Sequence, residues 1–435
     1  MMFRRTNMAA LALWGGLSAL PSAAAAQTIT ASVFDTIVPF DYNRGRNESV
    51  LDRPRTAFDP IGLKAGSFTV LPSLATSVGF NSNVYQVPTE KTSDGFVLIA
   101  PSVRAVSDWS VHSLSVDASA GLKRFSSAAP RNEDAWSLGT DGRIDVDADD
   151  FLSLGVRTSR IYESQFSGAS LNNIRSSVPA QVTTFRGSSE SRLSRVRLVF
   201  SGDHSVFDYQ PVTNFSNVVI AQTDRNRDIT RAIGHVEYGL MPDAGLFVQV
   251  VGVRTHYKTP LATGAPNRNS RDLRILTGIS LDISALVRGS VGVGYTDRNY
   301  DSPVYRNIGG LSVNARLEYF PSKMTTVSLA ARREVEDAVI ATTSGYFNNG
   351  VTLRIDHELL RNLLLNAAVD YERDVFIGID GRATILRTTG GARYMVNNLI
   401  GLDASVGYSR RSSNSVATGP SLDEMRGLLG IIIHR

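Results

Sequence analysis

The chain has 435 residues, with 45 Lys and Arg against 41 Asp and Glu, so its charge is nearly balanced and does not indicate a nucleic-acid partner. It contains no cysteine, which excludes a disulfide scaffold, a cysteine-ligated metal site and a lipidated N-terminal cysteine. The mean hydropathy of −0.07 does not exclude a membrane protein, because alternating apolar and polar residues cancel in a membrane β-barrel.

Residues 1–26 are predicted to be an export signal. Two arginines precede an apolar stretch over 8–20, and small residues follow as far as Ala26. We expect cleavage after Ala26, so that the mature chain starts at Gln27 and is exported through the inner membrane. A membrane anchor is the alternative, but the apolar stretch is short for one.

Residues 27–66 are polar and rich in Asn, Arg, Asp and Pro, so we expect an irregular extension without a core of its own. Over residues 67–435 apolar and polar residues alternate, which predicts β-strands with one apolar and one polar face. For example, Leu402 and Val406 share one face while Asp403 lies on the other. The clearest segments are 67–80, 111–125, 151–160, 195–206, 311–319, 351–358, 363–372 and 400–409.

The connections between these segments predict the architecture. We count about 18 strands, with 16 as the second choice, joined by alternately long and short connections. A soluble β-sandwich has no reason to keep its long loops at one end, whereas an outer-membrane barrel has short periplasmic turns and long outer loops. Lipid also requires closure, because an open edge leaves backbone groups unsatisfied. The sequence therefore predicts an all-β, transmembrane, up-and-down antiparallel barrel over 67–435, with a periplasmic extension over 27–66.

Aromatic residues near both ends of the predicted strands suggest two interface belts. The belt near the short turns would contain Trp109, Phe151, Tyr238, Tyr319, Phe320 and Tyr394. The belt near the long loops would contain Phe80, Phe125, Trp136, Tyr162, Tyr295, Tyr371 and Tyr408.

If the apolar face of each strand meets lipid, the polar face lines the lumen. Two interpretations of these charges stay open: a lattice of ion pairs that stiffens the wall, or a solute path whose charges guide a substrate. The lumen-lining candidates are Arg104, Asp117, Arg143, Arg157, Arg197, Asp203, Arg316, Glu318, Arg354, Asp356, Asp370, Arg393 and Asp403.

Nothing in the sequence predicts catalysis. The six histidines are scattered, there is no GxSxG elbow and no histidine spacing typical of a metal site, so we expect no enzyme, no metal and no cofactor. The glycines of "SVGVGYT" (290–296) and "TTGGARY" (388–394) lie in predicted strands, where they allow curvature or close approach of the wall rather than hold phosphate.

The stretch "RPRTAFDPIGLKAGSFTVLPSLATSVGFNSNVY" (53–85) resembles the start of the putative β-barrel porin 2 family, and "PSVRAVSDWSVHSLSVDASA" (101–120) continues the likeness. The resemblance implies an outer-membrane barrel. Because some members are encoded among exopolysaccharide genes, it also implies a role in moving or anchoring surface polysaccharide. The chain departs from a pattern common among outer-membrane barrels, since it ends in Ile433, His434 and Arg435 rather than in an aromatic residue.

Two functional hypotheses follow. The first is a porin-like channel of the outer membrane that serves exopolysaccharide export or secretion. The alternative is a non-conducting structural or docking barrel of a cell-envelope assembly, whose extension plugs the lumen or binds a periplasmic protein. The expected partners are outer-membrane lipid, the barrel assembly machinery and periplasmic polysaccharide-export components.

Overall fold

The alternating segments form β-strands, as their period of two requires. A computed structural model describes residues 48–147, 149–164, 166–167, 173–261, 264–283, 286–338 and 343–435. The predicted export signal and the extension as far as residue 47 lie outside the described residues. Within the described ranges, no helix has the length and hydropathy needed to cross a membrane.

The strands are β1 (Leu63–Ala65), β2 (Phe68–Asn81), β3 (Asp94–Ser107), β4 (Ser113–Phe125), β5 (Glu133–Asp145), β6 (Phe151–Glu163), β7 (Val178–Leu193), β8 (Val196–Tyr209), β9 (Val212–Thr213), β10 (Val219–Ile220), β11 (Arg227–Met241), β12 (Ala244–Tyr257), β13 (Ser270–Ile283), β14 (Val287–Tyr300), β15 (Ile308–Ser322), β16 (Thr325–Glu336), β17 (Tyr346–Leu360), β18 (Leu363–Phe376), β19 (Arg382–Met395), β20 (Ile400–Ser413) and β21 (Leu422–His434). Short 3₁₀ helices, η2 (Ala129–Arg131), η3 (Thr223–Arg225) and η4 (Val416–Thr418), interrupt three of the loops.

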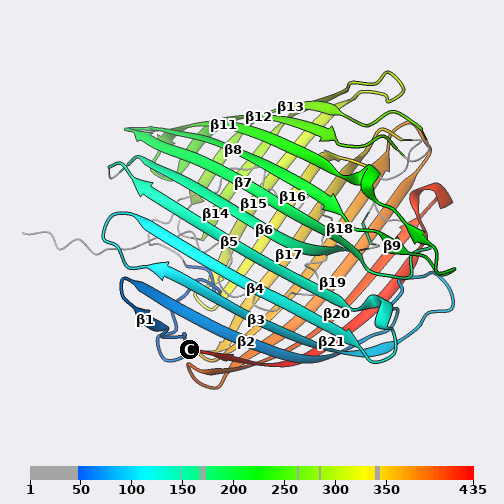
Figure 1. Ribbon diagram of the computed structural model, residues 1–435. Helices are drawn as coiled ribbons and strands as arrows, with labels where there is room; N and C mark the ends of the chain where they lie inside the picture. The colour runs from blue at the N-terminus through cyan, green and yellow to red at the C-terminus, as the bar shows by residue number, and fades with distance from the viewer. Residues whose placement is uncertain are drawn as a thin grey trace, which may run out of the picture.

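Eighteen of these strands, β2–β8 and β11–β21, close into a barrel (Figure 1). Each pairs antiparallel with the next one along the chain, β8 pairs with β11, and β21 pairs with β2 to complete the ring. The predicted all-β, up-and-down barrel is therefore confirmed, with 18 strands rather than 16. The pairing of β21 with β2 extends to His434, and the Arg435 amide donates to the Pro72 carbonyl at 3.2 Å.

The two ends of the barrel differ, as the loop lengths predict. Eight connections have two to five residues, and we call their side the turn end. Nine connections have five to seventeen residues, and we call their side the loop end. The turn end lies to the left in Figure 1, where β1 and the C-terminus also lie. Within the range expected to be irregular, β1 pairs antiparallel with the start of β2.

Most barrel strands have an outer face of exposed apolar residues and an inner face that carries the charged ones. On β17, Val351, Leu353 and Ile355 are exposed, whereas Asp356 and Glu358 are buried. The register carries this alternation from strand to strand, because directly paired residues lie on the same face of a sheet. An exposed apolar band around a closed sheet is what a lipid environment requires.

The expected aromatic belts need one correction. Phe125, Phe151 and Phe320 lie on the inner face, because each shares the parity of the charged residues on its strand. Phe125 and Phe320 are buried, and Phe151 packs against the guanidinium of Arg143 at 3.8 Å. The position of an aromatic residue near a strand end does not determine its face, whereas its parity does.

Candidate channel interior

The structure places all thirteen predicted charged residues on the inner face of the wall. One cross-strand row shows how the register arranges them. Arg104 on β3 lies opposite Asp117 on β4, which lies opposite Gly139 on β5, which lies opposite Arg157 on β6. The row therefore holds two cations, Arg104 and Arg157, and one anion, Asp117. Gly139 lies between Asp117 and Arg157.

The glycine in this row lets an ion pair form across an intervening strand. The Arg157 guanidinium donates to both carboxylate oxygens of Asp117, each at 2.7 Å, and to the Ser137 hydroxyl at 2.9 Å. A Cβ atom on Gly139 would lie only 2.6 Å from the Arg157 guanidinium, so a larger residue would displace it. Both oxygens of the carboxylate are engaged, the geometry in which guanidinium–carboxylate pairs are strongest.

Similar pairs continue around the wall on β7, β8 and β11. Arg197 binds Glu190 at 2.8 Å, and Asp203 binds Arg231 at 2.7 Å. Glu190 also binds Arg192 at 2.9 Å. Two of the predicted residues, Arg197 and Asp203, therefore pair with residues on the adjacent strands β7 and β11 rather than with each other.

The opposite wall, β16 to β20, carries a connected network of ion pairs. Arg354 binds Asp356 at 2.8 Å, and Arg393 binds Asp403 at 2.7 Å, so both members of each pair are predicted residues. Asp370 binds Arg387 at 2.7 Å. Arg387 in turn reaches Glu372, at 3.1 Å, and Arg332 binds the same Glu372 at 2.7 Å.

Three further predicted residues, Arg143, Glu318 and Arg316, have neighbours on the same inner face. Arg143 binds Asp145 at 2.6 Å. Glu318 accepts a hydrogen bond from Arg288. Arg316 lies opposite Ser290 on β14 and Ala330 on β16.

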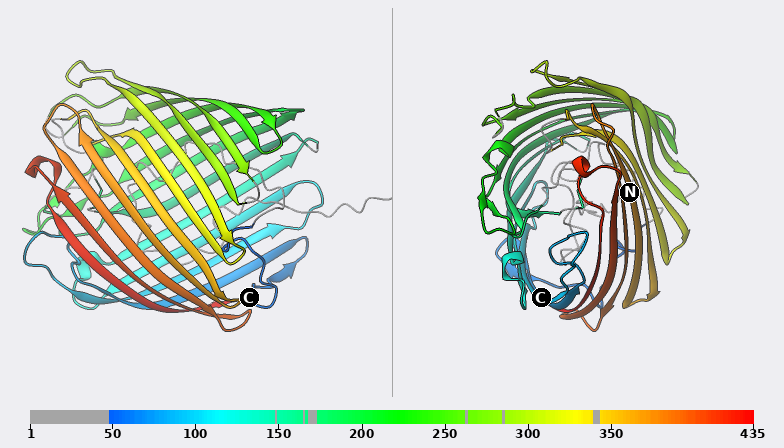
Figure 2. Two further views of the ribbon diagram at one scale, coloured as in Figure 1. Left: turned by 180° about the vertical axis from the view of Figure 1, so that it is seen from behind. Right: turned by 90° about the vertical axis from the view of Figure 1, so that its right-hand side faces the viewer.

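At the turn end, residues 49–59 pack on the inner face of the wall (Figure 2). The Val50 side chain is buried against Leu364 and Met395, and its amide donates to the Thr326 hydroxyl at 2.9 Å. Because these wall residues face inward, the segment occupies part of the lumen. We call residues 49–59 the inner segment.

The inner segment is held by one buried carboxylate. Glu358 on β17 accepts from Arg53 at 3.2 Å and from Arg55 at 3.0 Å, and Arg361 from the next turn lies 3.6 Å away. Glu358 and Arg55 are both buried. Arg55 also donates to the Val50 carbonyl at 2.6 Å, which folds the segment back on itself.

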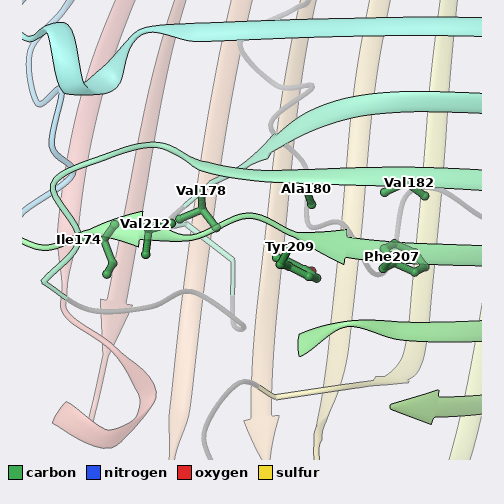
Figure 3. Packing of buried hydrophobic residues seen from close by; sticks show 7 residues of the cluster. All are labelled: Ile174, Val178, Ala180, Val182, Phe207, Tyr209 and Val212. Carbon is green, nitrogen blue, oxygen red and sulfur yellow. The ribbon is translucent and has the colours of Figure 1, made fainter. Parts of the chain in front are cut away.

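At the loop end the interior holds apolar clusters beside buried ion pairs, such as the pair of Arg225 with Glu163. A cluster on the inner face of β7 and β8 includes Val178, Phe207 and Tyr209, and it is joined by Ile174 and Val212 from the loops (Figure 3). These side chains point into the barrel, so the cluster narrows the lumen on the side of β7 and β8.

A second apolar contact crosses the barrel. Phe166, in the loop after β6, is buried against Tyr346, Phe376 and Ile385 on β17, β18 and β19. These strands lie on the far wall, so the Phe166 side chain packs across the interior from β6. The described lumen is therefore narrowed by apolar residues at the loop end and by the inner segment at the turn end.

Sequence reasoning missed several charged residues of this interior. Arg231 and Glu237 follow a period of two along β11, so parity could have found them. Glu358 belongs to a predicted polar face, but its role depends on the inner segment, for which the sequence carries no periodic signal. Arg298 binds Asp272 at 3.2 Å and Asp337 at 2.8 Å at the loop end of the interior.

The glycines singled out in the sequence allow close approach of neighbouring strands. A Cβ atom on Gly294 would lie 1.7 Å from the Ile275 carbonyl oxygen, and one on Gly391 would lie 3.1 Å from the Ala404 carbonyl oxygen.

His235 is buried on the inner face, and its ring nitrogen lies 3.2 Å from the Gln249 side chain. Among the described residues no group of acidic and histidine side chains could hold a metal ion.

Comparison with known proteins agrees with this architecture. A family model described as putative beta-barrel porin 2 matches residues 55–435. The chain belongs to the putative β-barrel porin 2 family. Membership together with the closed barrel implies an outer-membrane protein of porin type, as the resemblance in the sequence predicts. No curated protein matches the chain.

Several solved porins have a similar fold at low sequence identity. The chain is 11% identical to Pseudomonas aeruginosa OpdK, crystallised with vanillate, with a TM-score of 0.47 over 84% of this chain and 99% of that one. It is 11% identical to Acinetobacter baumannii OccAB3, with a TM-score of 0.47 over 85% and 100% of the two chains. It is 11% identical to Pseudomonas aeruginosa OccK2 (OpdF), solved in complex with glucuronate, with a TM-score of 0.45 over 84% and 98%.

Proposed function

We propose that this porin-type barrel is a channel for small polar solutes that discriminates only weakly between cations and anions. The observation that carries the proposal is the cross-strand pairing of charges on its inner face. Arg157 with Asp117, Arg387 with Asp370 and Arg393 with Asp403 are examples from separate parts of the wall.

The pairing bears directly on selectivity. Rings of like charge in a pore favour ions of the opposite sign, whereas a guanidinium that contacts a carboxylate contributes little net potential a few ångströms away. The same pairs still offer donors and acceptors to a polar solute. A closed barrel of about 18 strands is also wide enough for an aqueous lumen unless protein fills it.

The test is the conductance of the purified protein in a planar lipid bilayer, with the reversal potential measured across a KCl gradient. We expect discrete conductance steps and a cation-to-anion permeability ratio within about threefold of unity. A bilayer that stays sealed contradicts the channel. A ratio beyond about tenfold contradicts the weak selectivity.

The inner segment supports a second candidate, a barrel plugged at the turn end. It packs in the lumen through Val50 and is tied to the wall through Arg53, Arg55 and Glu358. In that case the intact protein conducts weakly or not at all, and deletion of the inner segment opens it.

The proposed role is non-catalytic. The role in exopolysaccharide export that the family resemblance implies stays a prediction, which neither the family model nor the structural neighbours support. Contact with the assembly machinery or with periplasmic export components also stays a prediction, and binding of polysaccharide to the reconstituted barrel would test the export role.

A further inference from the structure

The outer face of six consecutive strands, β15 to β20, has an unusual distribution of charge. Its outward positions in these strands carry no Asp or Glu, and the register shows apolar rows such as Leu329–Leu353–Val369 along most of its height. All the arginines on this face lie at its loop end. They are Arg333, Arg373, Arg382 and Arg410.

The arginines belong to a continuous row of polar side chains. Arg333 lies opposite Asn349, which lies opposite Arg373. The row continues through Thr384 to Ser412. Every one of these side chains can donate a hydrogen bond, and neighbouring strands about 4.8 Å apart make the row about 19 Å long. We call these five residues the donor row.

Contacts within the wall hold the first arginine in place. Arg333 donates through Nε to the Leu311 carbonyl at 3.0 Å and through its guanidinium to the Asn349 side chain, and its Cζ lies 4.2 Å from the centroid of the Phe347 ring. Asn349 donates to the Arg373 carbonyl at 2.8 Å. The guanidinium is therefore fixed on the surface by neutral partners, none of which cancels its charge.

The second arginine is exposed. Among the residues that the structure describes, the Arg373 guanidinium has no hydrogen bond or ion pair. Two carboxylates lie on this rim near the other two arginines: Asp423 on β21, opposite Arg410, binds Lys91 at 2.7 Å, and Asp380 in the loop after β18 lies 3.9 Å from Arg382. Arg333 and Arg373 thus leave a positive charge on the outer wall.

The height of the donor row fits the boundary of a membrane. From Leu363, at the turn end of β18, to Arg373 is about ten residues, which span about 33 Å along the strand. A strand tilt of about 40° reduces this to about 25 Å along the membrane normal, which is the height of the apolar band in outer-membrane barrels. The arginines therefore lie where lipid chains end and headgroups begin.

The geometry points to a binding site for a phosphate-bearing headgroup of an outer-leaflet lipid on the donor row. Arginine forks bind phosphate oxygens in pairs, and the amide and hydroxyl groups of the row supply further donors. The apolar rows below would pack against the acyl chains of the same molecule. A lipid is favoured over a soluble anion because the row ends directly on the lipid-facing apolar band.

The test uses the purified full-length barrel and the binding of diphosphorylated lipid A, measured by native mass spectrometry and by fluorescence titration. The variant Arg333→Gln/Arg373→Gln should bind this lipid at least about tenfold more weakly than the natural protein. Enzymatically dephosphorylated lipid A should bind both proteins equally. The matched control is Arg124→Gln/Lys258→Gln, which removes the same charge from outward-facing positions elsewhere on the loop-end rim, where Arg124 pairs with Asp134 and Lys258 with Asp228. The control should stay within about twofold of the natural protein.

Three results would overturn the assignment. In the first, the Gln variant binds the diphosphorylated lipid as tightly as the natural protein does. In the second, the natural protein binds dephosphorylated lipid as tightly as the diphosphorylated one. In the third, millimolar inorganic phosphate competes fully for the site, which would indicate a site for free anions. If the double variant does not assemble, Arg373→Gln decides, because this exposed side chain has no protein contact to lose; a loss of at least about threefold is expected. Conductance should be the same in all variants, so failure of the lipid site and failure of the channel proposal are separate results.

Discussion

Glu358 is the residue on which the inner segment depends, because it accepts hydrogen bonds from both Arg53 and Arg55 in a buried position. Glu358→Gln leaves these guanidiniums without their counter-charge, and loss of one member of a buried pair costs up to about 3–5 kcal/mol. We expect faster amide hydrogen exchange over the inner segment and unchanged exchange in the barrel strands. The control is Asp356→Asn, two positions away on the same face, whose partner Arg354 does not contact the segment. Equal protection in both variants would contradict the anchor.

Gly294 tests the close approach of strands in the wall. A Cβ atom there would lie 1.7 Å from the Ile275 carbonyl oxygen, so Gly294→Ala must push β13 and β14 apart. We expect the free energy of unfolding to fall by about 1–3 kcal/mol, the usual cost of overpacking. Gly252→Ala is the control, because a Cβ atom at Gly252 meets nothing within 4 Å. Urea unfolding in lipid vesicles provides the comparison, and similar midpoints for the two variants would disprove the explanation.

At this scale the sequence predicted which face a residue takes but rarely its partner. Parity placed Asp117 and Arg157 on one face. Their contact, however, crosses the intervening strand β5 and is possible only because Gly139 has no side chain in its path. Parity also indicates the inner face for Phe125, because Phe125 lies at an odd position like Asp117 and Lys123. The belt prediction was wrong for Phe125 because it relied on the position near the strand end instead.

The inner segment is the element whose removal should change conduction most. Deletion of residues 49–59 removes Val50 and both arginines from the turn end of the lumen. We therefore expect a larger single-channel conductance in a planar bilayer, because a wider aqueous cross-section carries more current. If conductance is unchanged, the segment does not obstruct the path.

A matched control for the deletion breaks a contact of the neighbouring strand β1 instead. Lys64 on β1 binds Asp108 in the turn after β3 at 2.6 Å, and this hydrogen bond from Lys64 lowers the pKa of the Asp108 carboxyl. Lys64→Ala/Asp108→Ala removes this exposed pair. Because it leaves the inner segment in place, conductance should match that of the natural protein.

The barrel strands could be predicted because two independent signals agree. A period of two defines each strand, and the alternation of short turns with long loops defines the antiparallel ring. The alternation is weak along β7, because Arg186 and Glu190 face inward while Gly187 and Ser189 face outward, so its two faces differ little. The packing of loops inside the barrel gave no such signal, since Phe166 contacts residues far along the chain without any periodicity.

The balance of charge in the whole lumen makes a further prediction. Arg157→Gln/Arg387→Gln leaves Asp117, Asp370 and Glu372 without these guanidinium partners. We expect the reversal potential to shift in the direction of cation selectivity, because uncompensated carboxylates attract cations. The cation-to-anion permeability ratio derived from it should rise a few-fold. The mirror variant, Asp117→Asn/Asp370→Asn, should shift it toward anions. Two shifts of the same sign, or none, would show that these pairs lie outside the conducting path.

The ring closes through residues about 360 positions apart, since Ser73 on β2 pairs with His434 on β21. Until those two strands meet, the first and last strands each present a row of unpaired amides and carbonyls, which lipid cannot satisfy. Contacts this distant along a chain are slow to form, so the final pairing is the natural bottleneck in the kinetics of folding. A chain that lacks β21 would therefore expose two unpaired strand edges at once, on β2 and on β20, and such edges pair readily with other chains.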